Sequence, residues 1–169
     1  IFNDIDKTKK KRHILVNRTI ISARSLDKFF QRINATLVKL YGVKISDKIY
    51  ISGDLATYIQ NSPEKITVCN AIYVPDKFHV QRLVKKYIGQ KLEISDLSKF
   101  DSFIEAYLDA LENYPCDKND IDYHTLFNLL KNNPSSIRNW YNDDYLGCCQ
   151  ECINSHYFAD RLDKKPNTF

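Results

Sequence analysis

Two aspartates follow short apolar segments of the sequence at the point where each segment ends. Asp54 comes after Lys48–Ser52 and a glycine, and Asp76 comes shortly after Ile66–Val74. Carboxylates at the carboxyl ends of parallel strands face the crevice in which α/β sheets bind ligands. Aspartate is also a favoured helix N-cap. Both residues are therefore candidate ligand-binding groups, and capping of the following helix is the structural alternative for each.

Asp76 belongs to a second pattern, because an imidazole follows it three residues later at His79. Helix positions i and i+3 share a face, so both side chains would point the same way. Such a pair can orient a ligand or a metal-bound water. An N-cap aspartate and a hydrogen-bonded surface histidine explain the pair as well, and the pattern taken alone favours this simpler interpretation.

A third group of reactive side chains lies near the end of the chain. Glu151 falls in the first turn of a helix expected from about Cys149 to Leu162, with His156 and Arg161 further along. A glutamate at this point is also favoured by the helix dipole. The pattern predicts an acidic group presented by a helix, with a histidine and an arginine on the same element.

The cysteines of this segment have the residue types of a zinc site. Cys149 and Cys152 have the spacing of metal ligands and His156 follows them. A structural zinc ion requires four ligands, and Cys148 is adjacent to Cys149, so both would have difficulty facing one ion. Small buried cysteines that pack at the start of a helix are the favoured interpretation.

The elements that must position these residues alternate between strands and helices. Residue types and hydrophobic spacing predict strands at His13–Ser22, Lys48–Ser52 and Ile66–Val74, and helices at Leu55–Ile59 and from Lys77 to Gly89. A further helix is predicted from Leu26, after Ser25 as its N-cap, to the glycine at position 42. This alternation is typical of an α/β sheet. Residues 93–140 then change to purely helical spacing and predict an acidic, all-helical insertion.

Charge is distributed unevenly along the 169 residues, whose net charge is +4. Residues 1–50 carry 12 Lys/Arg against 4 Asp/Glu, a net charge of +8, whereas residues 93–125 carry 2 against 9, a net charge of −7. A basic half suits phosphate binding through counterion release. Two solvated helix surfaces of opposite sign are the alternative.

Composition narrows the class of protein. Hydrophobic residues make up 43% of the chain, as in a globular protein, and no apolar run approaches the roughly 20 residues of a membrane span. Five cysteines, three of them within five positions, favour a reducing cytosol over a secreted disulfide framework. Methionine is absent, which predicts an internal piece of a longer chain. The glycine-rich nucleotide-binding motifs and the GxSxG motif of acyl transfer are missing.

Taken in order, the segments YISGD, YVPDKFHV and GCCQECINSHYFADRLDKKP resemble a family of DDE transposases from insertion sequences and integrative elements of low-GC bacteria. In that family a strand ending in GDGA carries the second catalytic aspartate and a DKFH segment follows it. A helix with a pattern close to E-G-x-x-S-H-x-x-x-x-R-x-x-x-x-P carries the catalytic glutamate. The resemblance extends from about Arg12 to Pro166.

The resemblance implies an α/β protein with an RNase H-like fold, in which helices flank a mixed sheet and an all-helical insertion precedes the last helix. Residues 1–92 would form part of the catalytic core, residues 93–140 the acidic helical insertion, and residues 141–169 the terminal catalytic-core helix. The implied location is the bacterial cytoplasm, in association with the nucleoid.

The activity implied by the resemblance is metal-dependent cleavage and transfer of DNA strands in the full-length protein, with Mg²⁺ or Mn²⁺ in a two-ion site. Asp54 and Glu151 would be catalytic metal ligands, and His79 would orient the scissile phosphate. Accessory positions would be Asp76, His156 and Arg161. The basic cluster would bind the DNA backbone through Lys7, Lys9, Lys10, Lys11 and Arg12. The implied partners are transposon ends and target DNA, not a membrane, and a homo-oligomer on DNA is a further option.

The chain departs from the family pattern at three points. Leu55 replaces a glycine of GDGA, Cys152 replaces the glycine after the glutamate, and the first catalytic aspartate has no match. Asp4 and Asp6 are the only early candidates, and they precede a basic loop, so neither is assigned. Whether this chain is an enzyme by itself is left open. The alternative is an inactive transposase remnant that acts as a DNA-binding or protein-interaction module.

Overall fold

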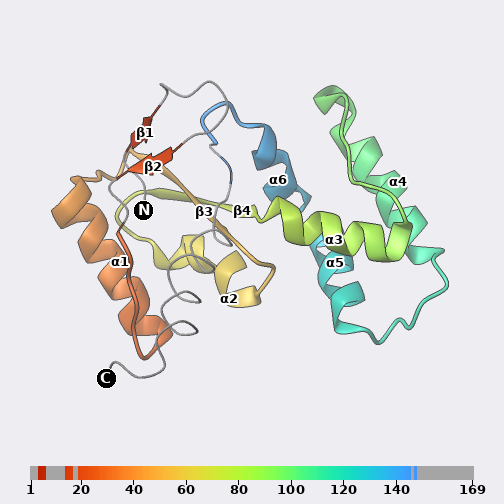
Figure 1. Cartoon of the computed structure of the whole chain (residues 1–169), viewed down its shortest axis with the longest axis horizontal. Helices are drawn as coiled ribbons and strands as arrows, with labels where there is room; N and C mark the ends of the chain where they lie inside the picture. Colours follow the sequence, from red (N-terminus) through yellow and green to blue (C-terminus); the bar gives the residue numbers. More distant parts are fainter. Residues whose placement is uncertain (1–3, 7–13, 17–18, 146, 148–169) are drawn as a thin grey trace. The chain divides into compact units, whose positions relative to one another are not determined.

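The computed structural model describes residues 4–6, 14–16, 19–145 and 147 (Figure 1). The chain divides into two compact units. The first comprises Ile1–Ile49 with Ser62–Ala71, and the second comprises Tyr50–Asn61 with Ile72–Phe169. Within the described part of the chain, the elements amount to a mixed α/β arrangement of six α-helices and short paired strands. The finer assignment to an RNase H-like fold stays a prediction.

The first unit contains a short antiparallel pair and the longest helix described. β1 (Asp4–Asp6) pairs with β2 (Ile14–Val16) so that Ile5 lies opposite Leu15. The strand predicted at His13–Ser22 is therefore too long, because residues 19–22 lie outside any strand. β-branched residues favour strands mainly through their packing against neighbouring strands, so composition alone overestimated its length.

Local signals set the ends of α1 (Leu26–Tyr41) as the sequence predicts. The Ser25 side chain accepts a hydrogen bond from the backbone N–H of Lys28, which gives the first turn its N-cap. Gly42 ends the helix with φ of 63°, a left-handed conformation in which glycine carries no side-chain penalty. The helix therefore begins after Ser25 and ends at Gly42, as predicted.

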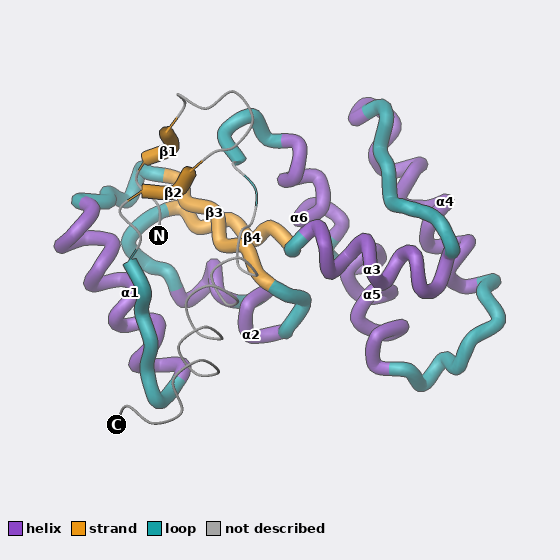
Figure 2. The backbone as a smooth tube through the Cα atoms, in the orientation of Figure 1, coloured by secondary structure: helices purple, strands orange, loops and turns teal. Residues whose placement is uncertain are grey.

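β3 (Lys48–Gly53) and β4 (Asn70–Pro75) form a two-stranded parallel sheet, drawn in orange in Figure 2. The Asn70 N–H donates to the Asp47 carbonyl over 2.8 Å. Six residues later on each strand, the Asp76 N–H donates to the Gly53 carbonyl over the same distance. The register is therefore constant along the pair. β4 begins four residues later than predicted, after the 3₁₀ turn η1 (Ser62–Lys65).

The second unit is mostly helical after the strands. Its elements are α2 (Thr57–Gln60), α3 (Lys77–Ile88), the 3₁₀ turn η2 (Leu97–Lys99), α4 (Phe100–Glu112), α5 (Ile121–Asn132), α6 (Pro134–Arg138) and the 3₁₀ turn η3 (Asn139–Tyr141). Residues 93–140, all of them described, contain helices and no strand, as their spacing predicts. No helix in the described ranges is both long and apolar enough to cross a membrane.

α3 to α6 share one hydrophobic core, so the helices of residues 93–140 do not form a core of their own. Its fully buried members include Val80, Val84, Leu92, Leu111, Leu126, Leu129, Leu130 and Ile137. Leu55, from the segment before α2, joins the same cluster. The domain boundaries suggested by the sequence, at residues 92 and 140, stay a prediction.

A polar contact joins α3 to the start of α5. The Tyr87 hydroxyl donates to Asp120 over 2.6 Å, and the Lys86 ammonium lies 3.0 Å from Asp120 and 2.9 Å from Asp122. Asp120 also caps α5, since it accepts from the Asp122 N–H. The hydrogen bond from Tyr87, with those from Lys86 and Asp122, lowers the pKa of Asp120 to about 2. Its carboxylate therefore stays ionised at any pH near neutrality.

The shared core makes a stability prediction. Replacement of Leu130, fully buried in α5, by alanine should lower the free energy of unfolding by about 2–5 kcal/mol, because the change removes buried methyl groups and leaves a cavity. The control Ile121→Ala, on the same helix at 81% exposure, should change it by less than about 0.5 kcal/mol. Urea unfolding followed by circular dichroism measures both. Equal effects would show that the helices do not pack as described.

Candidate functional site

Asp54 and Asp76 each come directly after the last residue of one strand of the parallel pair, β3 and β4 respectively. Gly53 and Asp76 are joined by a backbone hydrogen bond of 2.8 Å, and Asp54 is the residue after Gly53. Both aspartates therefore lie at the carboxyl ends of adjacent parallel strands, which is the end of the sheet at which α/β proteins bind ligands. The prediction that each aspartate follows a strand is confirmed.

Asp54 forms a turn and does not cap a helix. Its Oδ1 accepts a hydrogen bond from the Ala56 N–H over 3.0 Å, two residues ahead, which closes an Asx turn. α2 begins only at Thr57, and its N-cap Ala56 offers no side-chain acceptor. The capping alternative, which required a helix beginning at Leu55, is therefore wrong for Asp54. The side chain is half-buried, and only its Oδ1 accepts a hydrogen bond among the described residues.

Asp76 does cap α3, so the structural alternative holds for this residue. Its Oδ1 accepts from the Phe78 N–H over 2.8 Å, and the residue is only 6% exposed. His79 lies in the first turn of α3, half-buried, with its ring edge-on to Phe78 at 5.7 Å between ring centres. The cap uses one carboxylate oxygen, Oδ1.

Tyr73 contacts the backbone of Asp54, and the sequence alone did not single it out. Its ring is buried on β4 and its hydroxyl donates to the Asp54 carbonyl over 3.1 Å. Burial raises the pKa of Tyr73 most, and the nearby charges of Asp54, Asp76 and Tyr145 raise it further. The Tyr73 hydroxyl thus lies beside the backbone of Asp54 and is influenced by both carboxylates.

The segment after α6 covers the outer edge of β4; residues 139–145 are called the closing segment from here on. The Asn139 side-chain amide donates to the Tyr73 carbonyl over 3.1 Å, and the Trp140 indole N–H donates to the Pro75 carbonyl over 2.7 Å. The backbone N–H of Asp76 points toward β3. Because backbone groups of successive residues point to opposite sides of a strand, the carbonyls of residues 73 and 75 point away from β3. The two side chains therefore take the place of a neighbouring strand along this edge.

The closing segment also reaches β3, at residues just before Asp54. The Tyr145 hydroxyl lies 3.1 Å from that of Ser52, and the Tyr50 hydroxyl donates to Asp144. The rings of Tyr50 and Tyr145 meet edge to face at 5.3 Å. None of these contacts was predicted. The signal that could have drawn attention to the segment is its composition, NWYNDDY, which combines three aromatic rings with four side chains that readily form hydrogen bonds.

Several of the predicted site residues lie outside the described part of the chain. They are the third acid Glu151, the accessory His156 and Arg161, the cysteines 148, 149 and 152, and the basic cluster Lys7, Lys9, Lys10, Lys11 and Arg12. Their predicted roles stay predictions. Among the described residues, no three His, Cys, Asp or Glu side chains gather as a complete metal site, so Asp54 and Asp76 provide at most part of one.

Comparison with known proteins identifies the family. Residues 3–169 match the model of the uncharacterised protein family UPF0236. The chain belongs to this family. No curated protein and no solved structure matches it. The family match covers the strand ends at Asp54 and Asp76, the closing segment and the predicted helix around Glu151, so all the elements of the candidate site belong to the family region.

The position of Tyr73 in this UPF0236 member gives a titration prediction. Its folded-state pKa lies above the ordinary value of 10, so the stabilisation from its buried, neutral hydroxyl is fully present below pH 10 and is lost as the pH rises above that value. Asp54→Asn keeps the acceptor of the Asx turn and removes a charge. It should lower the pKa of Tyr73, which stays above 10 because burial is the larger cause. Tyrosine ring-carbon NMR measures the pKa. Asp101→Asn, on α4, should leave the pKa of Tyr73 unchanged. An unchanged pKa in Asp54→Asn would contradict the influence of the Asp54 carboxylate on the Tyr73 hydroxyl.

Proposed function

We propose that this chain is part of the catalytic core of a metal-dependent DNA strand transferase of the DDE type, with Asp54 as a ligand of a divalent cation. The observation that carries the proposal is the placement of Asp54 and Asp76 at adjacent ends of the parallel pair, where both charges act on Tyr73. Two carboxylates at the ends of adjacent strands offer the hard oxygen ligands that Mg²⁺ and Mn²⁺ prefer.

The closing segment supports the participation of Glu151. Tyr145 contacts Ser52 on the strand that carries Asp54, and Glu151 follows Tyr145 by six residues in the sequence. Asp54 and Glu151 are 97 residues apart in the sequence, but the contact between Tyr145 and Ser52 brings the chain back to the strand of Asp54 six residues before Glu151. An extended link of six residues can reach across about 20 Å, so Glu151 is within reach of the strand end that carries Asp54.

Each residue has a defined part in the proposed reaction. Divalent cations in such a site activate the attacking oxygen and stabilise the leaving oxygen during phosphoryl transfer. Asp54 supplies a ligand oxygen, since the Asx turn occupies only its Oδ1. Asp76, fixed by its cap, adds negative charge beside the cation. His79, in the first turn of α3, orients the phosphate, and Glu151 completes the acidic set. DNA is the proposed substrate, with the basic cluster at residues 7–12 on its backbone.

Cation binding gives the first test. The 169-residue chain should bind Mn²⁺ weakly, because the first acid expected from the resemblance has no match in its sequence. Asp54→Asn should weaken this binding about tenfold or more, since the substitution keeps the turn and removes the charged ligand. Asp101→Asn removes an exposed carboxylate from α4 and should have no effect. Calorimetric titration measures all three, and equal affinity in the Asp54 variant would rule out its role as a ligand.

DNA binding and cleavage give the second test. The chain should neither nick nor join DNA with Mg²⁺ or Mn²⁺, yet bind duplex with an affinity that falls steeply as salt rises, because the +8 charge of residues 1–50 releases phosphate counterions. Fluorescence anisotropy at two salt concentrations and a plasmid-nicking assay measure both. Nicking that is abolished by Asp4→Ala or Asp6→Ala would reveal the missing acid.

The same assays separate the alternatives. Salt-dependent DNA binding without any Mn²⁺ binding at Asp54 favours an inactive remnant that acts as a DNA-binding module. The absence of DNA binding at low salt favours a protein-interaction module, in which the acidic residues 93–125 would contact a basic partner.

A further inference from the structure

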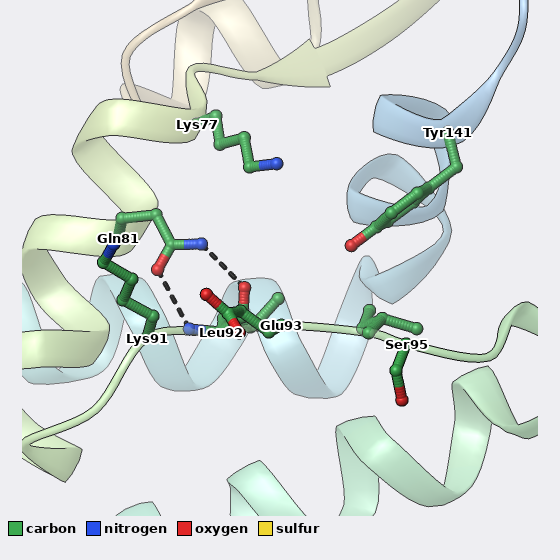
Figure 3. Close-up of a pocket in the computed structure, with 8 residues that line it drawn as sticks. Lys77, Gln81, Lys91, Leu92, Glu93, Ser95 and Tyr141 are labelled. Atoms are coloured by element: carbon green, nitrogen blue, oxygen red, sulfur yellow. Dashed lines mark hydrogen bonds between the residues drawn. The ribbon is translucent and has the colours of Figure 1, made fainter.

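A pocket of about 500 Å³ opens beside the candidate site, between α3, η3 and the segment that follows α3 (Figure 3). Lys77 and Gln81 line it from successive turns of α3, Tyr141 lines it from η3, and residues 91–95 form its floor. Lys77, which lines the pocket, is the residue after Asp76 of the candidate site. Its size suits a small ligand or a single unit of a longer one.

The floor of the pocket is held in place by side chains on both sides. The Gln81 amide donates to the Leu92 carbonyl over 2.7 Å and accepts from the Leu92 N–H over 2.9 Å, as the dashed lines in Figure 3 show. The Tyr107 hydroxyl donates to the Lys91 carbonyl and accepts from the Glu93 N–H. Leu92 and Ile94 are buried in the core below. The pocket is therefore formed in advance of any ligand.

The polar lining combines an aromatic ring with positive charge. The Lys77 ammonium lies 5.4 Å from the ring centre of Trp140 and 5.9 Å from that of Tyr141, toward which it points in Figure 3. No ion pair joins Lys77 or Lys91 to a carboxylate within the described ranges, so both charges are available to an anion. Glu93 is the single acid of the lining and can accept hydrogen bonds from an amino group.

We infer that this pocket binds one unpaired nucleotide of a DNA strand whose neighbouring phosphate lies at Asp54 and Asp76. The base stacks on Tyr141, Lys77 and Lys91 contact the phosphates, and Glu93 accepts from an exocyclic amino group such as that of cytosine. An unpaired nucleotide fits because a base within a duplex has no free face for a ring in a concave pocket. This inference rests on the proposed function, which places a DNA strand at the adjacent site.

A comparison of strands with and without bases tests the inference. The 169-residue chain is titrated with a labelled (dC)₁₂ strand, with a strand of the same length made of abasic units, and with free dCMP. Anisotropy gives the affinity, and quenching of Trp140, the only tryptophan of the chain, reports on events beside the pocket. The (dC)₁₂ strand should bind at least about fivefold more tightly than the abasic strand and should quench Trp140, because one stacked base contributes that factor.

Substitutions assign the preference to the pocket. Tyr141→Leu should remove the difference between the two strands, whereas Tyr141→Phe, which keeps the ring, should retain it. Lys91 is exposed, so Lys91→Gln leaves the fold intact and should reduce the salt dependence of (dC)₁₂ binding by about the contribution of one phosphate contact. This variant keeps the inference testable if the leucine variant does not fold.

The remaining outcomes contradict the inference in distinguishable ways. Equal affinity of the wild-type chain for both strands would refute the pocket and leave the proposed function intact. Binding of dCMP as tight as that of (dC)₁₂ would assign the pocket to a free nucleotide. Failure to bind any strand, together with loss of the Mn²⁺ result, would refute both proposals.

Discussion

The outer edge of β4 imposes the constraint on which the rest of the second unit depends. A two-stranded sheet leaves backbone carbonyls along its edges, and a buried carbonyl without a donor costs free energy. Here Asn139 and Trp140 supply the donors to Tyr73 and Pro75, from a segment more than 60 residues away in sequence. The strand end that carries Asp76 is therefore stabilised by side chains that follow α6.

This edge contact couples the candidate site to the hydrophobic core. η3 follows α6, whose Ile137 is buried in the core that α3, α4 and α5 share. α3 in turn begins at Asp76, and Tyr87 near its end binds Asp120 at the start of α5. Asp76 and the closing segment are thus fixed through the same set of helices. A substitution in that core is expected to disturb the site without contact with either aspartate.

Local features could be predicted from the sequence because their causes are local. Ser25 and Gly42 bound α1, and Asp76 and Gly89 bound α3, since a cap acts on backbone groups only a few residues away. The strand ends before Asp54 and Asp76 were found for a similar reason: an apolar run followed by glycine or proline and an acid marks where a strand stops. Helical spacing likewise predicted that residues 93–140 contain no strand.

The contacts between distant segments could not be predicted, because they depend on which residues the fold brings together. Tyr73 was one apolar residue of a strand until its hydroxyl was placed beside Asp54. Trp140 and Tyr145 bind partners 65 and 93 residues away, a distance that no periodic pattern reports. The helical character of residues 93–140 was predicted, but the packing of these helices onto α3 required the structure. The predicted length of the first strand was wrong for the same reason, since strand pairing is a non-local property.

The negative charges of Asp54 and Asp76 exceed what their local structure requires, and this excess is the strongest physical argument for a functional site. Asparagine closes an Asx turn and caps a helix about as well as aspartate does. The turn at Ala56 and the cap at Phe78 therefore need an oxygen acceptor but not a charge. Asp76 is only 6% exposed, and Lys77, the next residue in the sequence, is directed to the rings of Trp140 and Tyr141. The proposed divalent cation at the strand ends would use both charges, whereas a purely structural turn or cap requires neither of them.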